Sequence, residues 1–583
     1  MRRVRAWLAA SLLYRVFLAR YRRPFVLGLL ALLWVDVIDV ALPLLIKETV
    51  DSLVTGAATT YLAGIAAAYF LLVLLQAAGR YLWRIQLAGT SFRCDFDLRQ
   101  SLFGSLLRQG PDFFQRHPTG DVMSRATNDL SAVRFAVGPG LVIGMDALVY
   151  FLLLPPILLW LSPTLSAVIA APLVVVPFFV HHIRQAIAVR FKGVQAAFSR
   201  MSNKVQENLA GIRVVKGYCL GEAEGARFDR LGREYMAAQM RHAVPSSLFS
   251  PILELAAFVS LFLLLVVGGR MVIAGTMTLG TLVAFQRYLS KMTWPMTALG
   301  WSLSLFQRGA TSLERVDELV HAKPSIDPDA GETDGPLFPI IARDLTFTFA
   351  GAAHPAVAGI DFQIRAGEKV SLVGPVGGGK TALLAILARL HPVAPGQLAF
   401  GGRDSNAWQA GALRTRVGAV PQDPFLFSRS IADNIAYGGG AEAGRDAVEA
   451  AANLAGVADE IRALPGGFDA LLGERGVNLS GGQRQRTTLA RALIRKPDLL
   501  LLDDCLSAVD AATEQEILAH LGRTAVGRTV VFATHRLSAV RDADQIWVLE
   551  RGQIVERGTH EELVAAGGLY ARLWEEQPLT VGG

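Results

Sequence analysis

Cysteine is scarce in this sequence, and its scarcity argues against two classes of protein. The 583 residues include only three cysteines, Cys94, Cys219 and Cys505, which lie far apart. A small secreted domain held by disulfides needs several cysteines, and a cysteine zinc site needs closely spaced pairs. We therefore expect neither a disulfide framework nor a cysteine metal site, and we interpret these thiols as buried and structural.

The N-terminus lacks the features of a secretory signal. Arg15 and Arg20 interrupt its apolar stretch, and no small-residue cleavage site follows. The segment also lacks acidic residues, which leaves an amphipathic mitochondrial transit peptide as an alternative. We favour an interfacial elbow helix over residues 1–22, lying on the cytoplasmic face of a membrane.

Long apolar runs, in contrast, are abundant in the first half. The chain is 52% hydrophobic and its mean hydropathy is +0.36, which soluble globular proteins rarely reach. A span of the bilayer needs about 20 apolar residues. Six stretches qualify, at residues 25–46, 61–82, 137–161, 165–180, 251–267 and 279–303. We expect six transmembrane helices with cytoplasmic extensions, forming one membrane domain over residues 23–320.

Lysine and arginine are nearly absent from the short links between these spans. Residues 51–60 and 162–164 have none, and residues 268–278 have only Arg270, whereas the two long links are rich in both. The positive-inside rule therefore makes both termini and both long links cytoplasmic. The long links are expected to continue the spans as helices. Their tips, near residues 117–121 and 208–216, could dock on a soluble domain.

Acidic residues are rare within the spans, and four of them need an explanation. They are Asp36, Asp39, Asp146 and Glu254. Ionisable groups inside a membrane are costly and often functional. The sequence leaves three interpretations open: contact with cargo, exposure to a water-filled cavity, or pairing with Arg287 or Lys291.

A polar linker over residues 321–340 separates the membrane domain from a second domain at residues 341–583. In the second domain, strand and helix patterns alternate, which predicts an α/β fold. The segment GPVGGGKT fits the phosphate-binding pattern G-x-x-x-x-G-K-[ST], in which backbone N–H groups cradle phosphates. Its glycines are Gly374, Gly377, Gly378 and Gly379. Lys380 would reach the β- and γ-phosphates of ATP, and Thr381 would ligate Mg²⁺.

Residues 478–510 combine a helix start with the end of a strand. The turn LSGGQ opens a basic helix, and the apolar run at residues 499–502 predicts a strand buried on both faces of a parallel sheet. Asp503 and Asp504 follow directly, at the edge where α/β sheets hold ligands. We expect one acid to bind Mg²⁺ and the next to position a water molecule.

These motifs, in this order, resemble those of the ATP-binding cassette (ABC) transporters, and of the exporter half-transporters in particular. The resemblance covers nearly the whole chain. It implies that Phe349 stacks on adenine, that Gln422 senses Mg²⁺ and helps order the water, and that His535 contacts the γ-phosphate. It assigns the second Mg²⁺ ligand to Asp503. The LSGGQ signature, which completes the partner's ATP site in this family, supplies Ser480, Gly481, Gly482 and Gln483.

Other segments also match exporter motifs. Residues 473–476 resemble the exporter-specific loop and residues 507–510 the D-loop. Residues 113–130 resemble the first coupling segment and residues 207–218 the second, which contacts the partner chain in the family. The resemblance therefore predicts a membrane helical bundle of exporter type fused to an α/β P-loop nucleotide-binding domain.

Asp504 departs from the family pattern, which normally has glutamate as the general base at this position. Aspartate is one methylene shorter, and a general base must lie within hydrogen-bond reach of the proton it takes. We expect a degenerate site that binds ATP and hydrolyses it slowly, unless the backbone adjusts and lets Asp504 act normally. The pattern DDxxSAVD resembles one half of the heterodimeric multidrug-type exporters.

The sequence thus predicts an ATP- and Mg²⁺-dependent exporter of hydrophobic or amphipathic compounds in a bacterial inner membrane. The expected partners are a homologous half-transporter carrying the missing glutamate, the lipid bilayer and a small amphipathic cargo. A homodimeric lipid or peptide exporter and an ATP-gated regulator or channel subunit remain alternatives. The membrane spans exclude a nucleic-acid ATPase.

Overall fold

The computed structural model describes residues 20–440, 443–473, 476, 478–509, 513, 517 and 528–576, without the side chains of 173–186, 249–250, 253, 293, 296–297 and 538. The expected elbow helix lies almost wholly outside the described residues, and Glu474, Arg475 and Asp510 lie outside them. Cys94 and Cys505 are buried as predicted, whereas Cys219 is exposed, so the prediction of a buried thiol is wrong there. The chain forms two compact units. Unit 1 comprises Met1–Leu102 and Met123–Leu319, and unit 2 comprises Phe103–Val122 and Val320–Gly583.

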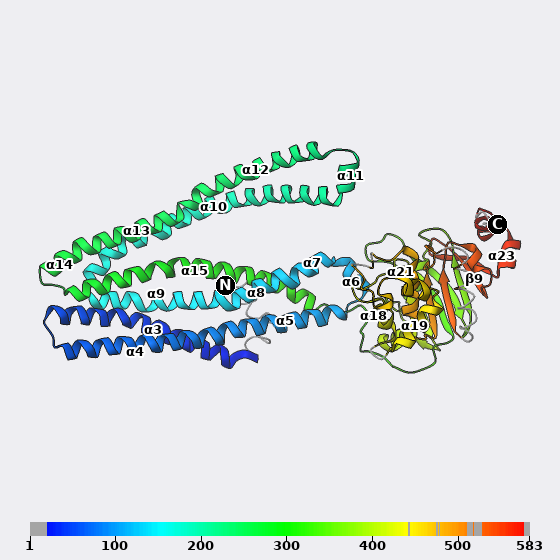
Figure 1. The fold of residues 1–583 in the computed structure, drawn as a ribbon, viewed down its shortest axis with the longest axis horizontal. Helices are drawn as coiled ribbons and strands as arrows, with labels where there is room; N and C mark the ends of the chain where they lie inside the picture. The colour runs from blue at the N-terminus through cyan, green and yellow to red at the C-terminus, as the bar shows by residue number, and fades with distance from the viewer. Residues whose placement is uncertain are drawn as a thin grey trace. The chain divides into compact units, whose positions relative to one another are not determined.

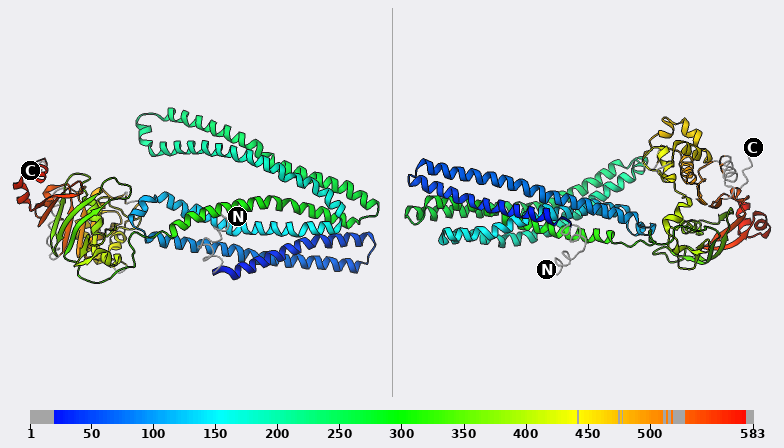
Figure 2. Two further views of the ribbon diagram at one scale, coloured as in Figure 1. Left: turned by 180° about the vertical axis from the view of Figure 1, so that it is seen from behind. Right: turned by 90° about the horizontal axis from the view of Figure 1, so that it is seen from below.

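The described part of the membrane half, residues 20–320, is helical (Figures 1 and 2). Its elements are α3 (Arg20–Val54), α4 (Thr59–Trp83), η2 (Arg84–Ala88), α5 (Gly89–Leu107), α6 (Pro111–Arg116), α7 (Thr119–Ser124), η3 (Arg125–Asp129), α8 (Leu130–Phe135), η4 (Ala136–Gly140), α9 (Leu141–Leu161), α10 (Pro163–Ala210), α11 (Ile212–Gly217), α12 (Gly221–Ser247), α13 (Phe249–Leu263), η5 (Leu264–Gly268), α14 (Gly269–Ile273) and α15 (Leu279–Val320).

Four stretches are long and apolar enough to cross a membrane among the residues searched. They are Arg20–Val54, Thr59–Leu107, Thr119–Leu161 and Glu254–Ile273, and they contain the first, second and third predicted spans and most of the fifth. The fourth predicted span falls in α10 and the sixth in α15. Both of these, and hence the count of six, stay predictions.

The long helical extensions predicted after the spans are present. The stretch Thr59–Leu107 is one continuous helix of 49 residues, with the π-helical turn η2 in its middle. At a rise of 1.5 Å per residue it is roughly 73 Å long, more than twice the hydrocarbon core of about 30 Å. α10 is of similar length, with 48 residues, and begins at Ser162, whose hydroxyl accepts from the N–H of Leu165.

The C-terminal part of unit 2 contains two sheets. Their strands are β1 (Ile340–Phe347), β2 (Val357–Ile364), β3 (Lys369–Val373), β4 (Leu398–Phe400), β5 (Arg403–Asp404), β6 (Val417–Val420), β7 (Leu499–Asp503), β8 (Thr529–Ala533), β9 (Gln545–Glu550) and β10 (Gln553–Gly558). The four-stranded sheet has the order β2-β1-β4-β5 and is antiparallel, and the six-stranded sheet has the order β10-β9-β3-β8-β7-β6. The strands from β9 to β6 in the larger sheet run parallel.

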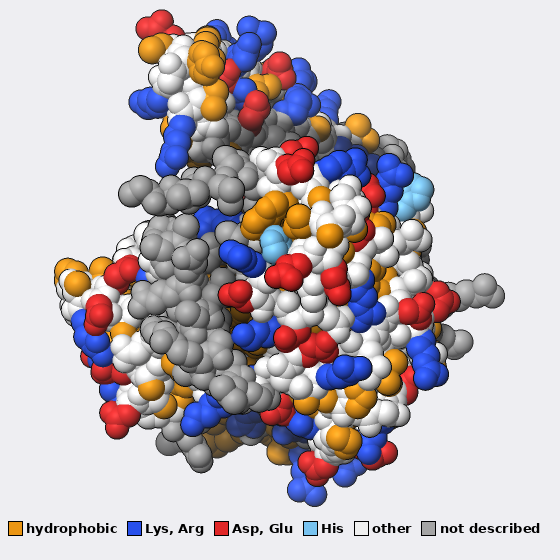
Figure 3. Space-filling view, turned by 90° about the vertical axis from the view of Figure 1, so that its right-hand side faces the viewer, with side chains coloured by type: hydrophobic (Ala, Val, Ile, Leu, Met, Phe, Trp, Pro, Cys, Tyr) orange, Lys and Arg blue, Asp and Glu red, His pale blue; other side chains and the backbone are white. Residues whose placement is uncertain are grey.

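Helices pack around these sheets. They are α16 (Lys380–Leu387), η6 (Ser405–Ala407), α17 (Ala410–Thr415), α18 (Ile431–Gly439), α19 (Arg445–Leu454), α20 (Ala458–Ala463), η7 (Gly467–Asp469), α21 (Gly481–Leu493), η9 (Leu537–Val540), α23 (His560–Ala566) and α24 (Leu569–Glu576). On the face drawn in Figure 3, Lys and Arg side chains are interspersed with Asp and Glu, as is usual for a solvated surface.

The apolar run at residues 499–502 forms the strand that its composition predicts. β7 lies between β6 and β8, parallel to both, and every one of its residues is buried. A strand with neighbours on both edges and side chains on both faces needs apolar residues without alternation. Since β3 and β7 are parallel members of one sheet, their carboxyl ends meet at the same edge.

Candidate functional site

The phosphate-binding pattern forms the predicted strand–loop–helix. The loop at residues 374–379 joins β3 to α16. Gly374 has φ 142° and Gly379 has φ 102°, and a Cβ on them would lie 2.0 Å from the Leu549 carbonyl and 2.3 Å from the Ala356 carbonyl. Only glycine fits at these two positions. The loop is therefore held close to neighbouring backbone, with no side chains there to fill the cradle.

Lys380, the first residue of α16, is buried and folds the loop around its ammonium. Its Nζ donates to the carbonyl oxygens of Gly374 at 2.8 Å and Pro375 at 2.9 Å. Burial lowers the pKa of Lys380, while Asp503 and Asp504 oppose that shift. The positive charge of this lysine thus lies between the loop and the two acids.

The two acids at the end of β7 differ in their surroundings. Asp503 is buried, and burial raises its pKa, against the opposing effects of a hydrogen bond with Thr381 and of the nearby Lys380 and His535. Asp504 is partly exposed and has φ 42°, in the left-handed region. Its backbone N–H donates to the Ala533 carbonyl at 2.8 Å, which fixes the turn after β7 against the end of β8.

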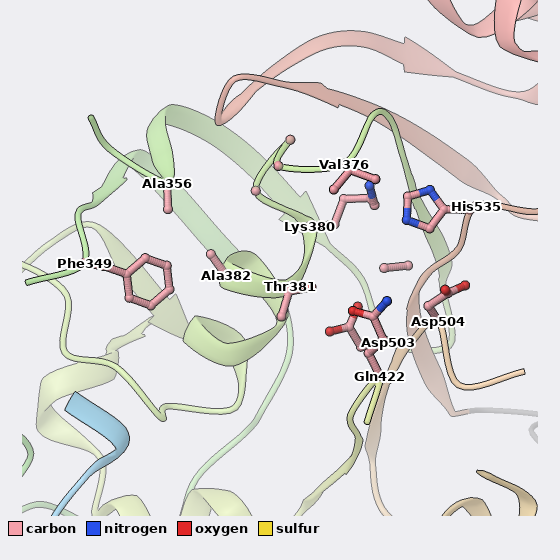
Figure 4. Close-up of a pocket in the computed structure, with 14 residues that line it drawn as sticks. Phe349, Ala356, Val376, Lys380, Thr381, Ala382, Gln422, Asp503, Asp504 and His535 are labelled. Atoms are coloured by element: carbon pink, nitrogen blue, oxygen red, sulfur yellow. The ribbon is translucent and has the colours of Figure 1, made fainter. Parts of the chain in front are cut away.

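A cavity of about 320 Å³ opens at this edge of the sheet. It is lined by Phe349, Ala356, Val376, Gly377, Gly378, Gly379, Lys380, Thr381, Ala382, Gln422, Asp503, Asp504, Ala533 and His535. Figure 4 shows Asp503 and Gln422 side by side beneath Thr381, with Asp504 and His535 on one side and Phe349 on the other. Residues predicted from five separate motifs therefore meet in one cavity, and Gly374 is the one predicted loop glycine that does not line it.

The residues at this cavity fit a nucleoside triphosphate with Mg²⁺. The Thr381–Asp503 hydrogen bond brings a hydroxyl and a carboxyl oxygen together, and Gln422 lies beside them. Within the described part of the chain, no group of three or more His, Cys, Asp or Glu is gathered for a metal. Mg²⁺ does not need such a group, because it commonly takes one or two protein oxygens, phosphates and water.

The signature residues lie elsewhere in the chain's fold. Ser480 is the N-cap of α21, and a capping box joins it to Gln483: the Ser480 hydroxyl accepts from the Gln483 N–H, and the Gln483 side chain accepts from the Ser480 N–H. None of the residues 480–483 lines the cavity described above. Gly482 is buried against the Ala508 carbonyl, 2.9 Å from where a Cβ would be. The predicted helix start is present, but it serves no site within this cavity.

Two residues that no motif indicated hold the described part of the D-loop, residues 507–509. Gln485 of α21 donates to the Ser507 hydroxyl at 3.1 Å and accepts from the Ala508 N–H at 3.0 Å. Arg536 donates to the carbonyls of Ser507 at 2.8 Å and Val509 at 2.7 Å. Since Arg536 directly follows His535, the D-loop is hydrogen-bonded both to α21, which begins at the LSGGQ signature, and to the neighbour of His535. The only sequence signal for Arg536 is that adjacency.

A third set of contacts joins Phe349 to α6, at the start of the first coupling segment. Phe349 packs edge-to-face on Phe347 and on His391, with ring centroids 4.9 and 5.3 Å away. Nδ1 of the buried His391 lies 2.8 Å from a carboxylate oxygen of Asp112 on α6. Gln109 also donates to the Ala322 carbonyl at 2.8 Å. α6, which leads into the first predicted tip, therefore docks within unit 2, next to the expected adenine site, and no motif indicated Asp112 or His391.

Comparisons with known proteins agree with this architecture. Residues 25–296 match the family model described as ABC transporter transmembrane region, and residues 357–507 match ABC transporter. The multidrug resistance-like ATP-binding protein MdlA of Escherichia coli is 36% identical over 504 residues, 86% of this chain and 85% of MdlA. A probable multidrug resistance ABC transporter protein of Bacillus subtilis, YheI, is 34% identical over 97% of both chains.

Two further similarities complete the comparison. An ATP-dependent lipid A-core flippase of Aromatoleum aromaticum is 34% identical, over 87% of this chain and 85% of the flippase. The structure of a bacterial Atm1-family ABC exporter with ATP bound superposes with a TM-score of 0.77 and 26% identity, over 97% of this chain and all of that one. The chain therefore belongs to the ABC transporters, as an integral-membrane exporter half-transporter whose membrane region is fused to an ABC ATPase domain.

Proposed function

We propose that this chain is one half of a heterodimeric exporter of hydrophobic or amphipathic compounds. Its own Walker site, built from the phosphate-binding loop at residues 374–381 and from Asp503 and Asp504 (the Walker motifs), binds ATP and hydrolyses it slowly. The observation that carries the proposal is Asp504. It lines the cavity at the position of the family's general base, while the neighbouring binding groups Lys380, Thr381 and Asp503 are intact. A short base beside complete binding groups favours nucleotide retention over turnover.

The aromatic and polar residues of the cavity each have a role in this proposal. Phe349 offers a ring face to adenine, and Lys380 stabilises charge on the phosphates. Thr381 and Asp503 hold Mg²⁺, which would neutralise charge on the β- and γ-phosphates. Gln422 and His535 both line the cavity. Gln422 helps order the attacking water, and His535 contacts the γ-phosphate.

Dimer formation brings a signature segment to each ATP cavity, which the single chain does not do for its own cavity. The capped N-terminus of α21, with Ser480 at its start, lies away from the chain's own cavity and presents first-turn N–H groups, which suit a phosphate. In the proposed heterodimer it completes the site built by the partner's Walker motifs. If the partner carries the glutamate, that site is the fast one. This chain then contributes a working signature and a slow Walker site.

Coupling to the membrane half runs through the first tip. α6 is held on unit 2 by Asp112 and His391, and the His391 ring touches Phe349. Binding of adenine against Phe349 would thus affect the position of α6 through the side chains of His391 and Asp112. We place both termini and unit 2 in the cytoplasm of a bacterium, with the helices in its inner membrane.

Homodimeric lipid export is the second candidate, and the flippase relative is the observation that favours it. Purification of the chain alone, and together with a co-encoded homologue, followed by phosphate-release measurements in lipid nanodiscs, separates the candidates. Slow hydrolysis alone and fast, cargo-stimulated hydrolysis in the pair support the heterodimer. Fast, lipid-stimulated hydrolysis by the chain alone supports the homodimer. ATP-dependent ion current without cargo transport would point to a channel subunit and refute both exporters.

A further inference from the structure

The membrane half contains a cluster of charged side chains that nucleotide chemistry does not use. Its three acids are Asp36 and Asp39 on α3, about one helical turn apart, and Asp146 on α9. Two basic residues belong to the same cluster: Arg80 on α4 and Lys291 on α15. Charges inside a bilayer must be compensated, so the partner of each acid can be identified in turn.

Asp39 is fully paired. Its carboxylate accepts from the Gln76 amide at 2.8 Å, from the Tyr150 hydroxyl at 2.5 Å, and from the ammonium of Lys291. The guanidinium of Arg80 lies 3.7 Å from Oδ1, the oxygen that also accepts from Gln76. Of the three interpretations that the sequence left open for the acids in the spans, pairing with Lys291 is the correct one for Asp39.

Asp36 and Asp146 are different, because their carboxyl groups are hydrogen-bonded to each other. Asp36 is only 1% exposed, and its Oδ2 has no hydrogen-bond partner among the described residues. Asp146 also has a hydrogen bond with Trp294. An ionised carboxylate is an acceptor only, so a bond between two carboxyl groups needs a proton on one of them. The contact itself therefore requires one bound proton.

A count of the charges in the whole cluster also gives one bound proton. Asp39 is balanced by Lys291, which leaves Arg80 to balance a single charge on the Asp36–Asp146 pair. Tyr150 is a neutral phenol that donates to Asp39. With one proton on the pair the cluster is neutral, and without it the cluster carries one uncompensated negative charge inside the membrane half. Ionising both carboxyl groups while they are in contact there would cost a large free energy.

We propose that Asp36 and Asp146 form a one-proton binding site in the membrane half, with a single proton held in the hydrogen bond between their carboxyl groups. The ligand is a proton, and the site is independent of which compound the transporter exports. Loss of the proton replaces a hydrogen bond between α3 and α9 by repulsion between two carboxylates. Proton occupancy therefore controls the packing of these two helices.

Infrared spectroscopy of the full chain in lipid nanodiscs tests this site directly. A protonated carboxylic acid has a carbonyl stretch separate from the carboxylate bands. At neutral pH the wild type should show this band, shifted by transfer to deuterated water. Asp36→Asn should lose it, since asparagine keeps the shape and the donor and has no acid proton. Glu48→Gln, at an exposed carboxyl on the same helix, should keep it.

The pH dependence of ATP hydrolysis gives a second, functional measurement. Above its midpoint a one-proton site loses occupancy about tenfold per pH unit, so the wild-type rate should fall on the alkaline side. Asp36→Asn mimics the loaded site and should remove that fall, while Glu48→Gln keeps it. The proposal is overturned if the wild type shows no acid band at neutral pH, or if the band survives in both Asp36→Asn and Asp146→Asn.

Discussion

Lengthening the side chain at position 504 tests the proposed asymmetry of the nucleotide sites most directly. Asp504→Glu moves the carboxylate outward by one methylene, about 1.5 Å. Loss of general-base placement costs about 10²–10⁴ in rate, or about 3–5 kcal/mol in barrier. We therefore expect Asp504→Glu to raise kcat of the purified chain at least about 100-fold, with little change in KM for ATP.

The backbone at position 504 adds a second expectation. Its φ of 42° is in the left-handed region, which aspartate adopts more readily than glutamate. The penalty, at most about 1–2 kcal/mol, is present in the ground state and the transition state alike. It should appear as a lower Tm of Asp504→Glu and leave the rate gain intact.

Phosphate release at saturating Mg²⁺ and ATP in nanodiscs is the assay, with fluorescent-nucleotide binding to report affinity separately. Lys380→Ala, which removes the buried ammonium, should abolish activity in both backgrounds. Asp504→Asn should change the slow wild-type rate little. If Asp504→Glu leaves kcat unchanged while Asp504→Asn lowers it by orders of magnitude, Asp504 is a competent base and the proposed slow site is refuted.

Three other changes address the contacts around the cavity. Phe349→Ala should raise the KM for ATP about tenfold by removing the stacking surface, and Phe349→Tyr should not; equal values for both variants would exclude adenine stacking. Asp112→Asn removes the carboxylate that bonds buried His391 and should lower transport per ATP hydrolysed severalfold at unchanged KM, measured by parallel transport and phosphate-release assays. The exposed neighbour Gln115→Ala is its control, and equal loss there would argue against a specific link. Arg536→Ala removes two hydrogen bonds to the D-loop and should lower kcat about tenfold, with Arg536→Lys intermediate; no change in kcat for the alanine variant would contradict a catalytic role for that support.

Much of the fold and site can be predicted from the sequence because the signals are local. The apolar run of β7 needs no partner to be recognised as a doubly buried strand, and the small residues before Lys380 specify a tight loop wherever it lies. Ser480 and Gln483, which form the capping box, are three residues apart, so the start of α21 can be predicted from the local sequence alone. Since β3 and β7 are parallel, their carboxyl ends necessarily share one edge.

The remaining features depend on contacts between distant segments. His391 and Asp112 are 279 positions apart, and neither stands in a motif. Asp39 and Lys291 are 252 positions apart, and the sequence offered Arg287 as an equal alternative because the facing side of α15 cannot be read from composition. The contact between Asp36 and Asp146 likewise requires knowledge of which faces of α3 and α9 meet.

The separation of the α21 N-terminus from the cavity has a genetic consequence. In the proposed pair, a substitution at Ser480 acts in trans, because the defect appears in the site that the partner's Walker motifs build. A substitution at Asp504 acts in cis and stays with the site that is already slow. Substitutions at position 504 thus have little effect on the transporter for as long as the partner keeps its glutamate. A substitution in LSGGQ, in contrast, impairs the fast site directly. A gene for such a chain can lose the general base at position 504 and still remain under selection, because its LSGGQ signature is needed for the partner's ATP site.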